Sequence, residues 1–203
     1  MIKFFDFDGV IVDSINECYI VSKDVYFGYT KFPYDEDEYK ALFYKYRGLV
    51  RPAYEYMILH VAIEDHLKNR EYDIRELFKK ILAIKTKKDK AFYEKEFFYR
   101  RSLYQDNDME SWLSMNPIMP FGKTLIGNSN QDVIIVTTKN KKAVEILLDY
   151  YKIGVSKIYA NDEIKPYGSK GSLITSVMDK SNIKEAIFLD DAVEHLETAR
   201  DSR

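Results

Sequence analysis

The stretch Met1-Ile2-Lys3-Phe4-Phe5-Asp6-Phe7-Asp8-Gly9-Val10-Ile11-Val12-Asp13 decides the fold of this 203-residue chain. Its apolar start, from Ile2 to Phe5, predicts a buried strand that ends where two aspartates, Asp6 and Asp8, begin. Side chains two positions apart on an extended chain share a face, so both carboxylates address one small volume. The stretch therefore predicts an acidic site at the end of a core strand.

Paired carboxylates of this kind suit metal-assisted phosphoryl chemistry. Two carboxylates a few ångströms apart repel each other unless a cation or a shared proton relieves them. A hard divalent ion such as Mg²⁺ takes oxygen ligands and leaves room for a phosphate group. One aspartate can then attack phosphorus while the other exchanges protons with the leaving group and with water. A solvated strand end is the plain alternative, whereas an EF-hand calcium loop is excluded because its first position would be Phe4.

The segment Phe5-Asp6-Phe7-Asp8-Gly9-Val10-Ile11-Val12-Asp13-Ser14 resembles motif I of the haloacid dehalogenase-like (HAD) superfamily, which consists mostly of phosphohydrolases. Three further motifs of that superfamily follow in order. The resemblance is to the branch of β-phosphoglucomutase and phosphoglycolate phosphatase, which carries a helical C1 cap. It implies that Asp6 is the nucleophile, that Asp8 is the acid and base, and that Mg²⁺ is the cofactor.

The second motif is Asp132-Val-Ile-Ile-Val-Thr137-Thr138-Lys139-Asn140. Its β-branched run predicts a central parallel strand closed by hydroxyl residues. The resemblance implies that Thr137 hydrogen-bonds the transferring phosphoryl group and that Thr138 assists through its backbone N–H. Taken alone, a threonine at a strand end is more often a helix cap.

The third motif is a lysine that offsets the charge of nucleophile and phosphate, and the sequence offers two. Lys165 begins a Lys-Pro dipeptide like that of many relatives, and its separation from Asp190 is close to the usual gap. We therefore expect Lys165 to fill the role. Lys170, which precedes a predicted helix, resembles another form of the motif and remains open as a substrate-binding residue.

The fourth motif is the apolar run from Glu185 that ends in Asp190 and Asp191. The resemblance implies that Asp190 ligates Mg²⁺ together with Asp6 and the backbone carbonyl of Asp8. It also implies that a second acidic group holds a metal-bound water or orients the lysine. Asp191 and Glu194 are both open for that role.

The remaining periodicity predicts an α/β protein with an insertion. Helical patterns cover residues 14–30, 35–47, 52–68, 73–85, 88–106, 140–152, 170–180 and 192–201. Strand patterns cover 132–136, 156–160 and 185–189. We expect a doubly wound parallel sheet, Rossmann-like, in a core domain of residues 1–14 and 116–203, with ligands at the carboxyl ends of the strands. Residues 15–115 should form the inserted α-helical cap, which selects substrate and excludes water.

One segment of the predicted cap suggests a substrate contact. Tyr46-Arg47-Gly48-Leu49-Val50-Arg51-Pro52 places a Gly-x-x-Arg pattern between two predicted helices. It resembles the specificity loop of capped relatives, which implies that Arg51, with Arg47 nearby, holds a part of the substrate distant from the reacting phosphate. Arginine suits this because it makes planar bidentate contacts with carboxylate or phosphate. A surface arginine that caps a helix is the alternative.

Composition excludes several classes of function. The net charge of −2 and pI of about 6.0 argue against a nucleic-acid surface, and the mixed charges of Lys85–Arg101 predict a solvated helix with a buried aromatic side. No apolar run is long enough to span a membrane, so we expect a cytoplasmic protein. The single Cys18 allows no internal disulfide. The three histidines, His60, His66 and His195, are scattered, and we assign them no chemistry.

These observations together predict a Mg²⁺-dependent phosphatase that acts through an aspartyl-phosphate intermediate. The predicted substrate is a small phosphorylated metabolite of carbohydrate metabolism or a related route, namely a sugar, polyol or small-acid phosphate. A phosphomutase that uses the same Asp6, and a non-catalytic member that binds a phosphorylated ligand, remain alternatives. We expect a monomer or a homodimer whose partner is a small phosphate ester, with no nucleic acid and no membrane.

Overall fold

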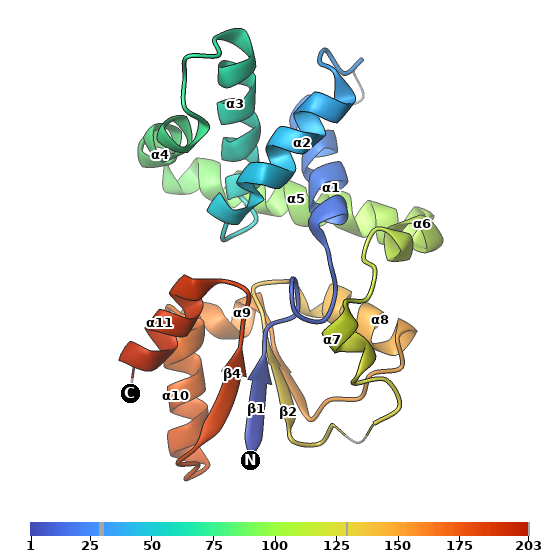
Figure 1. Cartoon of the computed structure of the whole chain (residues 1–203), viewed down its shortest axis with the longest axis vertical. Coiled ribbons are helices and arrows are strands. Elements are labelled where there is room, and N and C mark those ends of the chain that lie inside the picture. The colour runs from blue at the N-terminus through green and yellow to red at the C-terminus, as the bar shows by residue number, and fades with distance from the viewer. Residues whose placement is uncertain (29–30, 129, 203) are drawn as a thin grey trace. The chain divides into compact units, whose positions relative to one another are not determined.

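The computed structural model describes residues 1–28, 31–128 and 130–202 (Figure 1). It divides into two compact units, one of Met1–Ser14 with Asn116–Arg203 and one of Ile15–Met115. These are the ranges that the sequence analysis gives for core and cap. We call them the sheet unit and the helical unit and describe each by itself.

Within the residues that the structure describes, the sheet unit contains four parallel strands in the order β3-β2-β1-β4. The strands are β1 (Ile2–Phe5), β2 (Val133–Val136), β3 (Lys157–Tyr159) and β4 (Ala186–Leu189). The chain passes outward from β1 to β2 and β3 and then returns to the far side of β1, so the order reverses between β1 and β4. Ligands of open α/β sheets bind at such a reversal, at the carboxyl ends of the strands. The predicted α/β fold is confirmed.

The register of the sheet aligns the predicted acidic residues. Phe5 pairs with Ile135 of β2 on one side and with Leu189 of β4 on the other. The next residue of β1 and the next residue of β4 are Asp6 and Asp190, so these two aspartates leave the sheet side by side. Parallel pairing of β1 with β4 thus brings two aspartates that are far apart in the sequence close together in space.

Helices cover both faces of the sheet. They are α7 (Pro120–Lys123), α8 (Lys141–Tyr150), α9 (Asn161–Ile164), α10 (Lys170–Lys180) and α11 (Val193–Asp201), with a 3₁₀ turn at Lys165–Tyr167. Phe4 packs with Leu173 and Met178 of α10, whereas Phe5 meets the ring of Phe121 in α7 edge to face. The short helices α7 and α9 are not predicted by the sequence because a single turn shows no periodicity.

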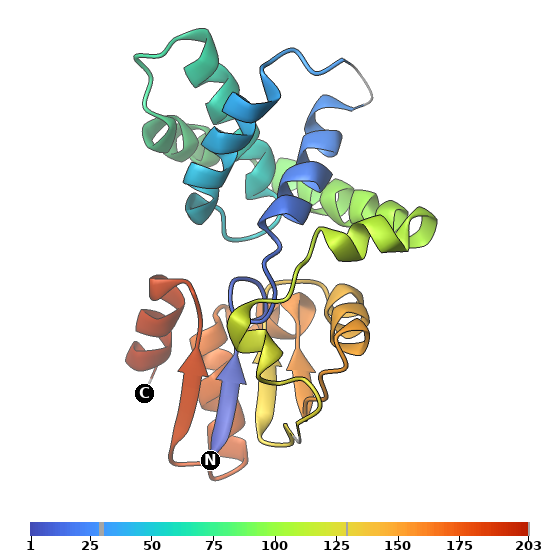
Figure 2. The ribbon, with the colours of Figure 1, turned by 45° about the vertical axis from the view of Figure 1, so that its right-hand side comes forward.

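Helices α10 and α11 lie against each other beside β4 (Figure 2). Gly171 makes this approach possible, since a Cβ at that position would lie 2.6 Å from the Cα of Ala199. The contact seats the first turn of α11 near the end of β4, directly after Asp190. Two helix starts are thereby brought to the carboxyl edge of the sheet.

The helical unit follows the predicted helices closely and adds a short one. Its elements are α1 (Ile15–Phe27), α2 (Glu36–Tyr46), a 3₁₀ turn (Arg47–Leu49), α3 (Glu55–Lys68), α4 (Ile74–Ile84), α5 (Lys87–Asn107) and α6 (Met109–Ser114). The last residues of the first predicted helix, 29 and 30, lie outside the described residues. Among the described helices, none combines the length and the apolar character that crossing a membrane requires.

An aromatic cluster fills the interior of the helical unit around His60. The imidazole is fully buried, with Nε2 2.9 Å from the hydroxyl of Ser22 and Nδ1 2.9 Å from the hydroxyl of Tyr39. Burial lowers the pKa of His60 to about 3, so the ring is neutral near pH 7. His60 is therefore part of the core, in keeping with the absence of any assigned chemistry.

A buried ion pair joins α1 to α5 and α6. Arg101 donates from Nε and Nη2 to the two carboxylate oxygens of Glu17, at 2.6 and 2.9 Å. The indole N–H of Trp112 donates to the same carboxylate at 3.3 Å. The sequence predicts a solvated helix with a buried aromatic side for this part of α5, yet Arg101 is only 3% exposed. Its charge is tolerated there because Glu17 neutralises it.

We predict that Arg101→Leu lowers the free energy of unfolding of the helical unit by about 3–5 kcal/mol, because it leaves the Glu17 carboxylate buried without its counter-ion. Urea titration followed by the fluorescence of Trp112, the single tryptophan, measures the change. The exposed Lys95→Leu is the matched control, with an expected effect within about 0.5 kcal/mol. The double variant Glu17→Leu/Arg101→Leu should recover most of the loss. Equal stabilities of Arg101→Leu and the control would contradict the assignment.

Candidate active site

Asp6 is the first residue after β1 and is held at both oxygens. Its Oδ1 accepts the backbone N–H of Phe7 at 2.7 Å, and its Oδ2 lies 2.7 Å from the ammonium of Lys170. Its own N–H donates to the carbonyl of Leu189 in β4 at 2.8 Å. The side chain is 9% exposed, so it is fixed in place but reachable.

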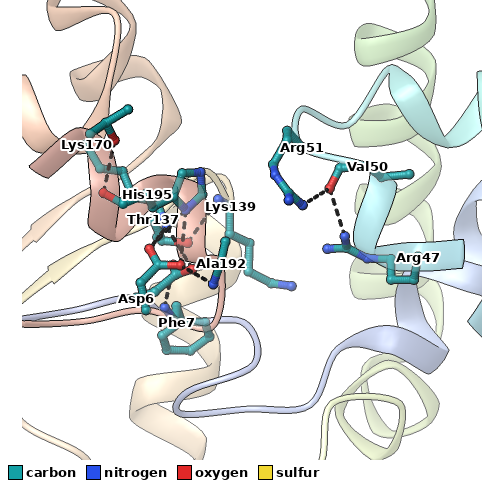
Figure 3. Close-up of polar contacts among 12 residues, drawn as sticks. Asp6, Phe7, Arg47, Val50, Arg51, Thr137, Lys139, Lys170, Ala192 and His195 are labelled. Carbon is teal, nitrogen blue, oxygen red and sulfur yellow. Dashed lines mark hydrogen bonds and ion pairs between the residues drawn. The ribbon is translucent and has the colours of Figure 1, made fainter. Parts of the chain in front are cut away.

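Lys170 lies between two carboxylates. It is the first residue of α10, whose preceding Ser169 accepts the backbone N–H of Ser172 as a cap. Its Nζ is 2.7 Å from Asp6 Oδ2 and 2.8 Å from Asp190 Oδ2, and the residue is 2% exposed (Figure 3). Burial alone would lower the pKa of Lys170, but the two carboxylates raise it overall. The lysine therefore stays charged and balances the pair.

The preference for Lys165 in this position is wrong. Lys165 begins the exposed 3₁₀ turn that precedes α10, and its ammonium pairs with Asp162 at 3.5 Å. Both side chains of that pair are mostly exposed, and such pairs contribute little to stability. The physical reason is the position at which the helix begins. Ser169 is the cap of α10, so the first turn of α10 places Lys170 at the strand ends.

Asp190 follows β4 and is buried, with several donors on its carboxylate. The backbone N–H of Ala192 donates to Oδ1 at 2.9 Å, and Lys170 donates to Oδ2. His195 Nδ1 lies 3.1 Å from Oδ1 and 3.0 Å from Oδ2. Burial would raise the pKa of Asp190, but these donors lower it overall.

The two carboxyl groups that contact Lys170 differ in the direction of their pKa shifts. Burial raises the pKa of Asp6 to about 6, and the neighbouring Asp190 and Asp8 add to this while Lys170 opposes it. Asp190, with more donors, ionises first. A cation beside Asp6 would favour its ionised form further.

Asp8 pairs with a lysine to which the sequence analysis gave no role. Lys139 Nζ lies 3.0 Å from Asp8 Oδ1, and its side chain is fully buried while that of Asp8 is 23% exposed. Lys139 follows β2 within the second motif, but a lysine just before a helix is usually solvated, so the sequence alone gave no signal. The structure thus provides one buried ammonium for each aspartate of the first motif.

The turn after Asp8 is in contact with the second aspartate of the fourth motif. Gly9 has a φ of +80°, which favours glycine, and a Cβ there would lie 2.4 Å from Asp191 Oδ2. Asp191 is exposed, and its carboxylate lies against the backbone of the first motif. Glu194, on the first turn of α11, is also exposed.

Thr137 is the first residue after β2 and is buried. Its N–H donates to the carbonyl of Tyr159 in β3, and its hydroxyl oxygen accepts the N–H of Lys139 at 3.1 Å. Figure 3 shows Thr137 on the same edge of the sheet as Asp6. Thr138 is exposed, and its role stays a prediction.

In the helical unit, Arg47 and Arg51 bind backbone carbonyls of their own loop. Nη1 of each guanidinium donates to the carbonyl of Val50, at 3.0 Å for Arg47 and 3.1 Å for Arg51 (Figure 3). Arg51 also donates to the carbonyl of Gly48 at 2.7 Å. The Gly-x-x-Arg loop is therefore preorganised, while contact with a substrate stays a prediction.

Three possible ligand groups, Asp6, Asp190 and His195, have atoms within 4.8 Å of one another. The ammonium of Lys170 already touches the two carboxylates of this group. Two unit charges 4 Å apart repel by about 4 kcal/mol at an effective dielectric constant near 20, and a divalent ion doubles that. The ammonium of Lys170 therefore occupies the space among these three side chains, and a metal ion that used Asp6 as a ligand would have to approach it from another side.

We predict that Lys170→Met destabilises the sheet unit by about 3–5 kcal/mol, because Asp6 and Asp190 then face each other without a cation. Urea titration followed by far-ultraviolet circular dichroism measures the loss. Lys165→Met is the matched control and should stay within about 0.5 kcal/mol of the wild type. Greater damage from Lys165→Met than from Lys170→Met would restore the original preference.

The fold resembles that of a solved protein. The crystal structure of a "putative phosphoglycolate phosphatase" from Lactobacillus plantarum aligns over 99% of this chain and 82% of its own, with a TM-score of 0.52 and 18% sequence identity. No family model and no curated protein matches the sequence. At this identity the similarity shows a shared fold, and that fold agrees with the HAD-like resemblance of the four motifs.

Proposed function

We propose that this protein is a Mg²⁺-dependent phosphomonoesterase that hydrolyses a small phosphorylated metabolite through an aspartyl-phosphate at Asp6. The observation that carries the proposal is the Lys170 ammonium between Asp6 and Asp190, where the strand order reverses. A carboxylate held beside a buried cation at this edge is suited to attack an electrophilic phosphorus. The phosphatase description of the structural neighbour supports the same class of reaction.

The residues present fit a magnesium ion. Its hard oxygen ligands would come from Asp6, from the backbone carbonyl of Asp8, and from Asp191, whose carboxylate lies against Gly9. We prefer Asp191 to Asp190 as the second carboxylate because each oxygen of Asp190 already accepts from two donors, whereas each oxygen of Asp6 accepts from one. When bound, the ion would neutralise charge on the phosphate.

In the first half of the reaction, an oxygen of Asp6 forms a bond to phosphorus while the bond from phosphorus to the ester oxygen breaks. Asp8 gives its proton to that leaving oxygen. Lys170 and the hydroxyl of Thr137 are placed to hold phosphoryl oxygens, which stabilises the charge that spreads over them in the transition state. The product is released as an alcohol, and Asp6 carries the phosphoryl group.

In the second half, Asp8 removes a proton from a water molecule, and the water oxygen attacks phosphorus. The bond between phosphorus and Asp6 then breaks, which restores the carboxylate and releases inorganic phosphate. The short pair with Lys139 fixes the direction of the Asp8 carboxylate between these two proton transfers. The cycle consumes one water molecule and leaves the protein unchanged.

The substrate we propose is a sugar, polyol or small-acid phosphate. The helical unit would serve as the cap that encloses such a metabolite and keeps bulk water out, as the HAD-like resemblance implies. Arg51 and Arg47 would bind the polar groups of the metabolite that lie far from the reacting phosphate. The guanidinium planes of both arginines are preorganised by their hydrogen bonds, which suits them to this role. The phosphoglycolate named for the structural neighbour falls within this class.

Asp6→Asn should reduce the hydrolysis of p-nitrophenyl phosphate by at least about 10³-fold, because an amide is a far weaker nucleophile than a carboxylate. Release of inorganic phosphate and of p-nitrophenolate in saturating Mg²⁺ measures it. Circular dichroism checks that the variant folds, and Lys165→Met serves as the matched control with unchanged turnover. An Asp6→Asn protein as active as the wild type would disprove the assignment.

Asp191→Asn should weaken Mg²⁺ binding by about 10-fold or more, because the site loses a charged oxygen ligand. Calorimetric titration of the metal-free protein with MgCl₂ gives the dissociation constants without requiring a substrate. Glu194→Gln is the comparison, since the sequence left both residues open, and we expect no change in affinity. If the loss appears in Glu194→Gln and not in Asp191→Asn, Glu194 is the supporting residue.

A further inference from the structure

His195 contacts a carboxylate of the site from outside the four motifs. Its Nδ1 lies 3.0 Å from Asp190 Oδ2 and 3.1 Å from Asp190 Oδ1, so this one nitrogen is within hydrogen-bond distance of both oxygens. Because a carboxylate oxygen only accepts, Nδ1 is the nitrogen that carries the proton. In the neutral ring Nε2 is then the acceptor.

The position of His195 depends on the same helix that carries Lys170. His195 is in the first turn of α11, and Lys170 is the first residue of α10. The contact between Gly171 and Ala199 fixes these two helices against each other. Lys170 and His195 therefore approach Asp190 from two helix starts whose separation is set by the fold.

The contacts leave Asp190 no freedom to turn. The N–H of Ala192 holds Oδ1, Lys170 holds Oδ2, and His195 spans both oxygens. Without His195, Asp190 would keep one donor on each oxygen, and only the ammonium at the end of the Lys170 side chain would oppose rotation about the Cβ–Cγ bond. Rotation would carry Oδ2 away from Lys170, and the ammonium would then be drawn toward Asp6 alone.

We propose that His195 is a positioning residue that, through its Nδ1–H, fixes the Asp190 carboxylate and so holds Lys170 at its place beside Asp6. The proposal deepens the proposed function and rests on it for the catalytic consequence. When Asp6 becomes phosphorylated it loses its negative charge, and Asp190 is then the carboxylate that keeps Lys170 in reach of the phosphoryl oxygens. The Nδ1–H of His195 reaches both oxygens of Asp190, and Lys170 keeps its own contact with Oδ2.

A purely structural role makes a different prediction. If His195 only supports the start of α11, a good helix former such as leucine should replace it without functional loss. Asparagine, a poorer helix former, should then be the more damaging substitution. The amide nitrogen of asparagine lies as many bonds from the backbone as Nδ1 of histidine, so only asparagine retains the donor.

The test compares His195→Leu, His195→Asn and the exposed control Glu197→Gln on the same helix. The first readout is the ammonium signal of Lys170 in ¹H–¹⁵N spectra selective for lysine side chains, assigned by its absence in Lys170→Met. It requires neither metal nor substrate. We expect the signal to be lost or broadened in His195→Leu and retained in His195→Asn and Glu197→Gln.

The second readout is kcat and KM for p-nitrophenyl phosphate with Mg²⁺. Loss of a residue that orients a catalytic group typically costs about 10–100-fold, and we expect His195→Leu to lose this in kcat with KM little changed. His195→Asn should recover most of kcat. Thermal denaturation of each variant checks that the folded fraction is equal.

The outcomes separate this proposal from the proposed function. A wild-type protein that hydrolyses no phosphate ester, but whose Lys170 signal depends on the Nδ1–H donor, keeps the positioning role and overturns the phosphatase. An active wild type whose Lys170 signal and kcat survive in His195→Leu overturns the positioning role alone. Greater damage in His195→Asn than in His195→Leu also overturns it.

Discussion

The contact on which the sheet unit depends is that of one ammonium with two buried carboxylates. Parallel pairing of β1 with β4 places Asp6 beside Asp190, and desolvation of two adjacent anions costs several kcal/mol each. A cation in direct contact offsets that cost, and Lys170 provides it. The charge balance therefore depends on both the strand register and the start of α10, because a shift in either would separate Lys170 from the two carboxylates.

The helical unit also contains a buried carboxylate whose charge is offset by a cation in direct contact. Glu17 lies in the first turn of α1 and Trp112 in α6, near the two points where the chain passes between the units. Arg101 of α5 binds Glu17 through both carboxylate oxygens, which joins three helices at that end. A buried charge pair is weak evidence for stability in general, but it fixes which helices meet and in which register.

The sequence predicts the parts of this structure that depend on local pattern. The apolar runs of β1, β2 and β4 and the longer helices are found within a few residues, since periodicity and strand-end chemistry are visible in one segment. Asp6, Asp8 and Asp190 are found because each follows such a run. The short helices α6, α7 and α9 are missed because they span too few turns to show a period.

The rest of the site depends on where helices begin and how they pack, which spacing does not reveal. Lys165 and Lys170 are five positions apart, and only the cap at Ser169 decides which one reaches the strand ends. No local sequence pattern identifies Lys139 or His195, because each contacts a carboxylate that lies in another segment or turn. Gly171 lets α11, which carries His195, approach α10, which carries Lys170.

The charges at the strand ends bear on which side chain suits the position of His195. The charged side chains at the strand ends are Asp6, Asp8, Asp190 and Asp191 with Lys139 and Lys170. When all four carboxylates are ionised, these six side chains carry a net charge of −2, which one divalent cation would balance. A third lysine or an arginine in place of His195 would reduce this charge and compete with Lys170 for Asp190. The imidazole of His195 instead donates from a single Nδ1–H that reaches both oxygens of Asp190, and Lys170 keeps its contact with Oδ2.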